Sequence, residues 1–172
     1  MFKHGCEVHS FDPSMLQPSY QRNESSWFHN LGLSSRNTDS YRPPPDQYVK
    51  APQVWQMRTL TSVKEMLGHT GRVIDLLKID IEGFEWDVVE NMRETGELEL
   101  LRQFSLEFHL FPKFPPMEDY VHLYKTFTNL REEMGFAEFS AHPHPKTLEK
   151  DKFNLQGDSQ FVNTLFRYPP AP

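Results

Sequence analysis

The chain has 172 residues, of which 37% are hydrophobic and 13% aromatic, and this composition suits one globular domain with an apolar core. The formal net charge is -6 at pH 7, and no run of Lys or Arg offers the basic surface that nucleic acids and anionic membranes require. No apolar stretch approaches the roughly 18 residues of a membrane span, and the amino-terminal residues lack the pattern of a signal peptide. We therefore expect a soluble domain with small neutral or cationic partners; the sequence predicts neither a compartment nor an oligomeric state.

The amino-terminal third predicts strands and a long loop. Alternating apolar and polar side chains over residues 6–11 indicate a strand that ends at a Pro-containing turn. A second strand is expected over residues 27–33, with a break at Gly32. Residues 34–52 include three consecutive prolines among polar residues, which is typical of a loop.

The middle of the chain contains the most informative stretch, "LLKIDIEGFEWDVVENM". A short helix over residues 60–67 should lead into a strand over 73–80. The nearly continuous apolar run of that strand predicts an inner parallel strand that is buried on both faces. After it, Phe84, Val88 and Met92 share one face of a helix that should pack on the sheet.

The carboxyl-terminal part continues the alternation of strands and helices. We expect a strand over residues 104–111, an amphipathic helix over 120–134, and two strands over 135–141 and 158–168 that are joined by a loop over 142–151. Strands that alternate with helices predict an α/β fold with a mostly parallel sheet, and the last two strands should form an antiparallel hairpin at its edge.

Asp12 is a candidate ligand-binding residue because it follows directly after the first predicted strand. A carboxylate at a strand end can accept two hydrogen bonds from the diol of a ribose. The alternative is that Asp12 only begins an Asx or Pro turn.

A second candidate site lies where the central strand becomes a helix. Asp80 and Glu82 flank this point, and Gly83 allows a ligand to approach the backbone. The two carboxylates could accept a proton or orient a polar substrate, or they could serve only as acids at a helix start. A cation held by Asp80, Glu82 and Glu85 is a third possibility, but without EF-hand or histidine spacing we predict no metal site.

His109 is the third candidate, and it lies two residues after Glu107 on the same face of a predicted strand. A histidine near the carboxyl end of a strand could act as a general base at neutral pH. The alternative is a histidine that is hydrogen bonded in the core.

Five stretches follow one another along nearly the whole chain in this order: "GCEVHSFDPSM", "TLTSVKEML", "IDLLKIDIEGFEWDVVENM", "SLEFHL" and "FVNTLFRY". In this pattern the chain resembles the FkbM-like methyltransferases, and in particular an animal group within that family. This resemblance implies a Rossmann-like class I methyltransferase sheet, S-adenosyl-L-methionine as cofactor, and methyl transfer to a hydroxyl of a small molecule or glycan.

The resemblance also implies roles for single residues. Asp12 would hold the cofactor ribose, the turn with Asn30, Gly32 and Leu33 would lie near the adenine, and Asp80 would lie beside the methyl-transfer centre. Together with the analysis above, the predicted catalytic residues are Asp80, Glu82 and His109.

One departure from the family concerns the first strand of this fold and its Gly-rich turn. Neither precedes the strand over 6–11, and no G-x-G occurs in the chain. We therefore expect residues 1–172 to form a single, N-terminally truncated domain that lacks one strand and has an incomplete cofactor pocket. A non-catalytic interaction domain of the same fold remains open, whereas the lack of G-x-G-x-x-G argues against a nicotinamide-dependent oxidoreductase.

Overall fold

The chain folds into strands and helices of a mixed α/β protein. A computed structural model describes residues 5–45, 49–111, 114–144 and 155–167. These form two compact units, Met1–Val63 and Lys64–Pro172. Among the described residues, none of the helices combines the length and the apolar character that crossing a membrane would require. The expectation of a single domain stays a prediction.

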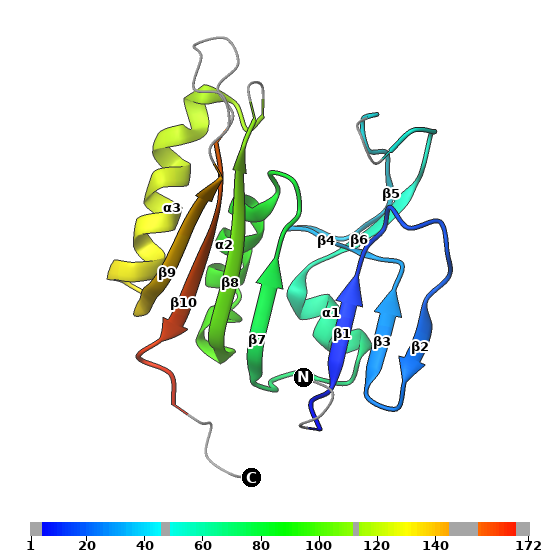
Figure 1. The fold of residues 1–172 in the computed structure, drawn as a ribbon, viewed down its shortest axis with the longest axis horizontal. Coiled ribbons are helices and arrows are strands. Elements are labelled where there is room, and N and C mark those ends of the chain that lie inside the picture. The colour runs from blue at the N-terminus through cyan, green and yellow to red at the C-terminus, as the bar shows by residue number, and fades with distance from the viewer. Residues whose placement is uncertain (1–4, 46–48, 112–113, 145–154, 168–172) are drawn as a thin grey trace. The chain divides into compact units, whose positions relative to one another are not determined.

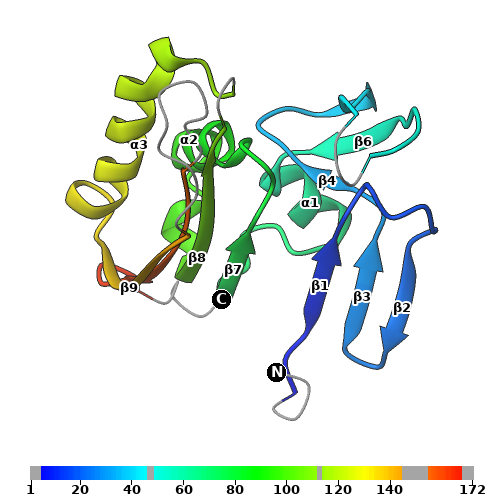
Figure 2. The ribbon, with the colours of Figure 1, turned by 45° about the horizontal axis from the view of Figure 1, so that its top comes forward.

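The first unit contains two three-stranded sheets. In one, β1 (Val8–Phe11), β3 (Ser26–His29) and β2 (Tyr20–Asn23) lie side by side in this order (Figure 2). In the other, β6 (Trp55–Arg58) lies between β4 (Gly32–Leu33) and β5 (Thr38–Tyr41).

Three of the elements that were predicted in the first unit differ from expectation, and β2 and β6 were not predicted. The predicted strand over 6–11 begins two residues later, because its pairing with β3 starts at Val8. The predicted strand over 27–33 is divided between β3 and β4, which belong to different sheets. The predicted loop over 34–52 contains β5, a strand at a sheet edge, where it needs only one partner.

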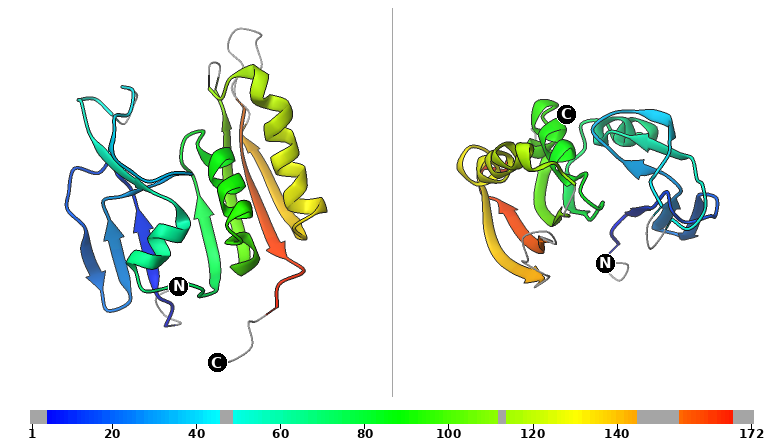
Figure 3. Two further views of the ribbon diagram at one scale, coloured as in Figure 1. Left: turned by 180° about the vertical axis from the view of Figure 1, so that it is seen from behind. Right: turned by 90° about the horizontal axis from the view of Figure 1, so that it is seen from above.

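The second unit contains one four-stranded sheet, which Figure 1 shows with its helices behind it. The strand order is β7 (Ile74–Ile79), β8 (Leu101–Leu110), β10 (Leu155–Asn163) and β9 (Phe136–His144). The helices α2 (Glu85–Glu94) and α3 (Tyr120–Glu132) cover one face of this sheet (Figure 3). A shorter helix, α1 (Leu60–Met66), precedes β7, and single 3-10 turns lie at Leu98–Leu100 and Met117–Asp119.

The two faces of β8 carry different side chains. Phe104 and Phe108 point to the helical side, where aromatic rings pack, with centroids 6.0 Å apart for Phe108 and Phe127 of α3. Glu107 and His109 alternate with these residues and therefore lie on the opposite face. The fold thus separates an aromatic core layer from a polar face on the same strand.

The expected mostly parallel sheet is wrong, because the sheets are mixed. The pairs β1–β3, β4–β6 and β7–β8 are parallel, whereas β2–β3, β5–β6, β8–β10 and β9–β10 are antiparallel. No helix lies between β2 and β3 in the chain, so these two neighbours pair antiparallel. The predicted carboxyl-terminal hairpin is confirmed by β9 and β10, and residues 145–151 of its predicted loop lie outside the described residues.

The strand β7 runs parallel to β8, as predicted, but it is not buried on both faces. Within the described part of the second unit it pairs only with β8 and ends the sheet. Leu76 is 40% exposed and Lys78 is exposed, whereas Ile79 is buried. Leu76 and Lys78 share one face of β7, which is therefore exposed at these positions, whereas Ile79 on the other face is buried.

Candidate functional site

The candidate site lies at the carboxyl ends of β7 and β8. In this parallel pair Ile79 is opposite Leu106, so Asp80 and Glu107 follow at the same level of the sheet. His109 lies two residues further along β8 and is 1% exposed. The carboxyl ends of adjacent parallel strands meet at one sheet edge, which explains why residues distant in sequence lie together here.

The turn between β7 and α2 has an unusual backbone. Glu82 has φ +56° and is the non-glycine residue with positive φ in the described ranges, and Gly83 follows with φ +99°. A Cβ atom at Gly83 would lie 2.6 Å from a ring carbon of Phe114, so this position requires glycine for space as well as for φ. Left-handed backbone at a non-glycine residue is found preferentially at functional sites.

Glu85 holds this turn together from the first position of α2. Its side chain is 0% exposed, and its two oxygens accept hydrogen bonds of 2.9 Å from the backbone N–H groups of Ile81 and Gly83. The same carboxylate lies 2.9 Å from Nδ1 of His109. One buried carboxylate therefore fixes both the turn and the orientation of the imidazole ring.

We expect Glu85→Ala to destabilise the chain by about 3 kcal/mol or more, because the buried N–H of Gly83, the part-buried N–H of Ile81 and the imidazole lose their acceptor. For a domain of this size, this loss lowers the melting temperature by roughly 6 to 12 °C. Thermal unfolding followed by circular dichroism measures the effect. Asp87→Ala is the control, since Asp87 is an exposed acid in the same helical turn. Equal losses in the two variants would show that Glu85 acts only on the helix dipole.

His109 faces a group of carboxylates with its other nitrogen. Nε2 lies 3.8 Å from Oε1 of Glu107, 3.9 Å from Oδ1 of Asp80 and 4.0 Å from Oε2 of Glu82. Burial lowers the pKa of His109, but the hydrogen bond to Glu85 and the charges of Glu85, Glu82 and Asp80 outweigh burial and raise it above the usual value. The ring of Phe111 stacks on the imidazole with centroids 5.3 Å apart.

Glu107 is partly buried and also belongs to this group of carboxylates. Burial raises the pKa of Glu107, and the charge and hydrogen bonding of Asp80 and the charge of Asp158 raise it further, whereas Lys78 opposes the shift. The Lys78 ammonium lies 3.6 Å from Oδ2 of Asp80 and 3.5 Å from Oε2 of Glu107. Negative charge therefore exceeds positive charge at this sheet edge, which suits it for accepting a proton or holding a cation.

The structure brings together the three predicted catalytic residues, Asp80, Glu82 and His109. Sequence analysis named Glu85 only as one ligand of a cation site that it did not predict, and Glu107 only as a neighbour of His109. The useful signal for Glu85 was its place directly after a Gly-containing turn, where its side chain can reach back to free N–H groups. The signal for Glu107 was its position on the same strand face as His109.

The predicted cofactor-binding residues lie in the first unit. Asp12 follows β1, and its Oδ1 accepts hydrogen bonds from the backbone N–H and the hydroxyl of Ser14, at 2.8 and 2.6 Å. Its Oδ2 has no hydrogen-bond partner in the described part of the chain, so this oxygen can accept a further hydrogen bond. The backbone N–H of Asp12 donates to the carbonyl of His29, which places Asp12 beside the turn that starts at Asn30.

The rest of that turn is used for packing. The Asn30 amide donates to the carbonyl of Gln17 at 2.9 Å. Gly32 is buried where a Cβ atom would collide with the Met57 side chain, so glycine is needed for close strand packing. Leu33 is half-buried in β4 and pairs with Arg58 of β6.

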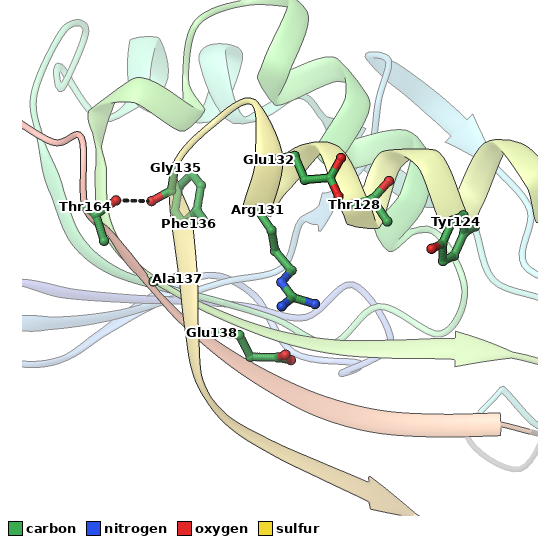
Figure 4. Close-up of a pocket in the computed structure, with 9 residues that line it drawn as sticks. All are labelled: Tyr124, Thr128, Arg131, Glu132, Gly135, Phe136, Ala137, Glu138 and Thr164. Atoms are coloured by element: carbon green, nitrogen blue, oxygen red, sulfur yellow. Dashed lines mark hydrogen bonds between the residues drawn. The ribbon is translucent and has the colours of Figure 1, made fainter.

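A groove of about 520 Å³ lies elsewhere in the second unit, between α3 and β9. Figure 4 shows Arg131 on α3 and Glu138 on β9 among its lining residues, with the Thr164 hydroxyl donating to the Gly135 carbonyl at 2.7 Å. None of the predicted site residues lines this groove. We therefore place the candidate active site at the ends of β7 and β8.

Comparison with known proteins relates this chain to methyltransferases. A family model described as "Methyltransferase domain" matches residues 1–155. The human protein "Probable methyltransferase-like protein 24" is 31% identical over 159 residues, which are 92% of this chain and 41% of that protein. Its rat counterpart is 31% identical over 155 residues, or 90% of this chain and 40% of that protein. No solved structure matches.

The chain thus spans about two fifths of the length of these curated relatives. The animal group whose motifs it resembles is the methyltransferase-like protein 24 group, and the predicted resemblance to this group is confirmed.

Proposed function

The chain belongs to the methyltransferase domain family, and from this premise we propose that it takes part in S-adenosyl-L-methionine-dependent methyl transfer to a hydroxyl oxygen. The acceptor class that we propose is a small molecule or a glycan, as in FkbM-like enzymes. The family match extends over residues 1–155, which supports the view that both units belong to one Rossmann-like domain.

The observation that carries this proposal is the group of Asp80, Glu82 and His109 at the carboxyl ends of two parallel strands. Ligands of open α/β sheets bind at this edge. The group is preorganised, because Glu85 fixes both the turn and the imidazole before any substrate arrives.

Asp80 is the residue that we assign to proton removal. Its side chain is 41% exposed, so a hydroxyl group can reach it, whereas the His109 side chain is 2% exposed and already faces carboxylates. A carboxylate oxygen that accepts the hydroxyl proton lets the acceptor oxygen form its new bond to carbon. His109 then serves to position the carboxylates rather than to touch the substrate.

Asp12 is the residue that we assign to the cofactor, through the Oδ2 oxygen that can accept a hydrogen bond from a ribose hydroxyl. S-adenosyl-L-methionine supplies a methyl group on a sulfonium sulfur, which keeps the bonding electrons when the methyl group leaves.

A non-catalytic interaction domain is the second candidate function. The observation in its favour is that Asn30 and Gly32, both predicted to bind the cofactor, are engaged in packing against Gln17 and Met57. Such a domain would keep the fold and lose cofactor binding.

Calorimetric titration with S-adenosylhomocysteine separates the two functions. We expect the chain to bind this compound, and we expect Asp12→Asn to weaken binding by about tenfold or more. Asparagine can keep the turn with Ser14 but loses an acceptor for a ribose hydroxyl, and tenfold corresponds to about 1.4 kcal/mol. Glu24→Gln, at an exposed position in the same unit, is the control. Absence of binding to the unmodified chain would favour the interaction domain, and equal binding by Asp12→Asn would remove Asp12 from the site.

A further inference from the structure

The polar group at the ends of β7 and β8 has the composition and spacing of a metal site. One ligand atom each from Asp80, Glu107 and His109 lie within 4.8 Å of one another. Bonds of about 2.1 Å to a common ion place its ligands roughly 3 to 4 Å apart. The distances of 3.8 and 3.9 Å from Nε2 of His109 to the carboxylates are too long for hydrogen bonds, but they suit two ligands of one ion.

His109 is the observation that distinguishes this group from a set of surface acids. The side chain is 2% exposed, and no hydrogen bond to its Nε2 is found among the described residues. When Nδ1 carries the proton and donates to Glu85, the lone pair of Nε2 points toward Asp80 and Glu107. Metal-binding histidines are oriented by carboxylates in the same way.

The oxygens of the two carboxylates face two different groups, the His109 imidazole and the Lys78 ammonium. Oδ1 of Asp80 and Oε1 of Glu107 face His109, whereas Oδ2 and Oε2 of the same residues face the Lys78 ammonium. Glu82 adds a further carboxylate 4.0 Å from Nε2. Lys78 is exposed and balances only part of this charge. An ion at the inner oxygens would therefore relieve repulsion without displacing Lys78.

We propose that Asp80, Glu107 and His109 bind a divalent first-row transition-metal ion. One imidazole and two carboxylates form a donor set that suits Mn²⁺, Fe²⁺ or Zn²⁺ better than Ca²⁺, which prefers oxygen ligands alone. Three protein ligands leave positions open on the ion. This inference rests on the proposed function in one respect: an open position would take the hydroxyl oxygen of the methyl acceptor, close to Oδ2 of Asp80.

Titration of the metal-free chain with Mn²⁺, followed by the electron paramagnetic resonance signal of the free ion, tests the site. We expect saturable binding that Glu107→Gln weakens at least about tenfold. Glu94→Gln makes the same substitution at an exposed position of α2 and should leave Mn²⁺ binding unchanged. Equal affinity of the two variants, or no saturable binding to the unmodified chain, would overturn the proposal.

A second measurement uses the unmodified chain and needs no variant to fold. Mn²⁺ broadens nuclear magnetic resonance signals close to it, so substoichiometric Mn²⁺ should broaden the ring signals of His109 before those of His122, an exposed residue on α3. Broadening of the His122 signals first would contradict the proposed metal site.

Titration with S-adenosylhomocysteine in the absence of metal keeps the two proposals apart. If the chain binds S-adenosylhomocysteine but not Mn²⁺, only the metal site is refuted. If it binds Mn²⁺ but not S-adenosylhomocysteine, only the proposed methyltransferase function is refuted.

Discussion

Val88→Asp should unfold the second unit or reduce its stability by several kcal/mol. Val88 is 1% exposed on the face of α2 that packs on the sheet, and an aspartate there would be buried without a partner. Domains of ordinary stability have only about 5 to 15 kcal/mol to lose. Urea unfolding followed by circular dichroism measures the loss.

The matched control for this substitution is Val121→Asp, which introduces the same charge on α3 at a valine that is 68% exposed. We expect the control to unfold at nearly the same urea concentration as the unmodified chain. Similar stabilities of the two variants would show that α2 does not pack on the sheet through Val88.

Asp80→Asn should reduce methyl transfer by about a hundredfold or more while the melting temperature changes little. Loss of a general base typically costs two to four orders of magnitude in rate, about 10² to 10⁴. A side chain that is 41% exposed contributes little to packing. Transfer of tritium-labelled methyl groups from S-adenosyl-L-methionine to a panel of hydroxyl compounds and glycans measures the rate, with melting temperature as the second readout.

Asp75→Asn is the control for Asp80, because Asp75 is an exposed carboxylate on the same strand and pairs with Arg102 away from the site. It should keep full activity. A parallel fall of activity and stability in Asp80→Asn would indicate a structural role for this acid. A larger loss of activity in Glu82→Gln would show that Glu82 is the base.

The long elements of the second unit were predictable from sequence because their patterns extend over many residues. The helices α2 and α3 and the strand β8 appear close to the expected ranges. The strands β2 and β5 were not predictable, since "YQRN" and "TDSY" are mostly exposed and show no apolar alternation. Even in α3 the apolar spacing is not a guide to burial at every position, because Tyr124 lies at helical spacing from Phe127 and is 69% exposed.

Strand order and the exposure of β7 were beyond local sequence patterns. An apolar run such as "IDLLKI" indicates a strand but does not say how many neighbours the strand has. That number depends on pairing between distant segments, and β7 proved to end its sheet in the described part of the second unit.

The proximity of the three predicted catalytic residues was predictable from sequence because it depends on strand topology. Asp80 and Glu82 follow β7, and His109 lies near the carboxyl end of the adjacent parallel strand β8; such strands bring their carboxyl ends together. The role of Glu85 in holding the turn and the imidazole was missed because an acid in the first turn of a helix already has an ordinary explanation in the helix dipole. Its burial follows from the left-handed turn at Glu82 and Gly83, which directs two N–H groups toward it, and sequence patterns do not specify that geometry.

The alternation of side chains along β8 has a consequence for how this protein can change during evolution. Phe108 belongs to the aromatic layer, and its neighbours Glu107 and His109 belong to the acidic edge. A substitution alters one of these surfaces and leaves the other as it was. A single-residue insertion or deletion inside the strand reverses both faces at once, because side-chain direction has a period of two. Descendants of this sequence can therefore diversify the chemistry of β8 residue by residue, but a change in the length of the strand would destroy core and site together.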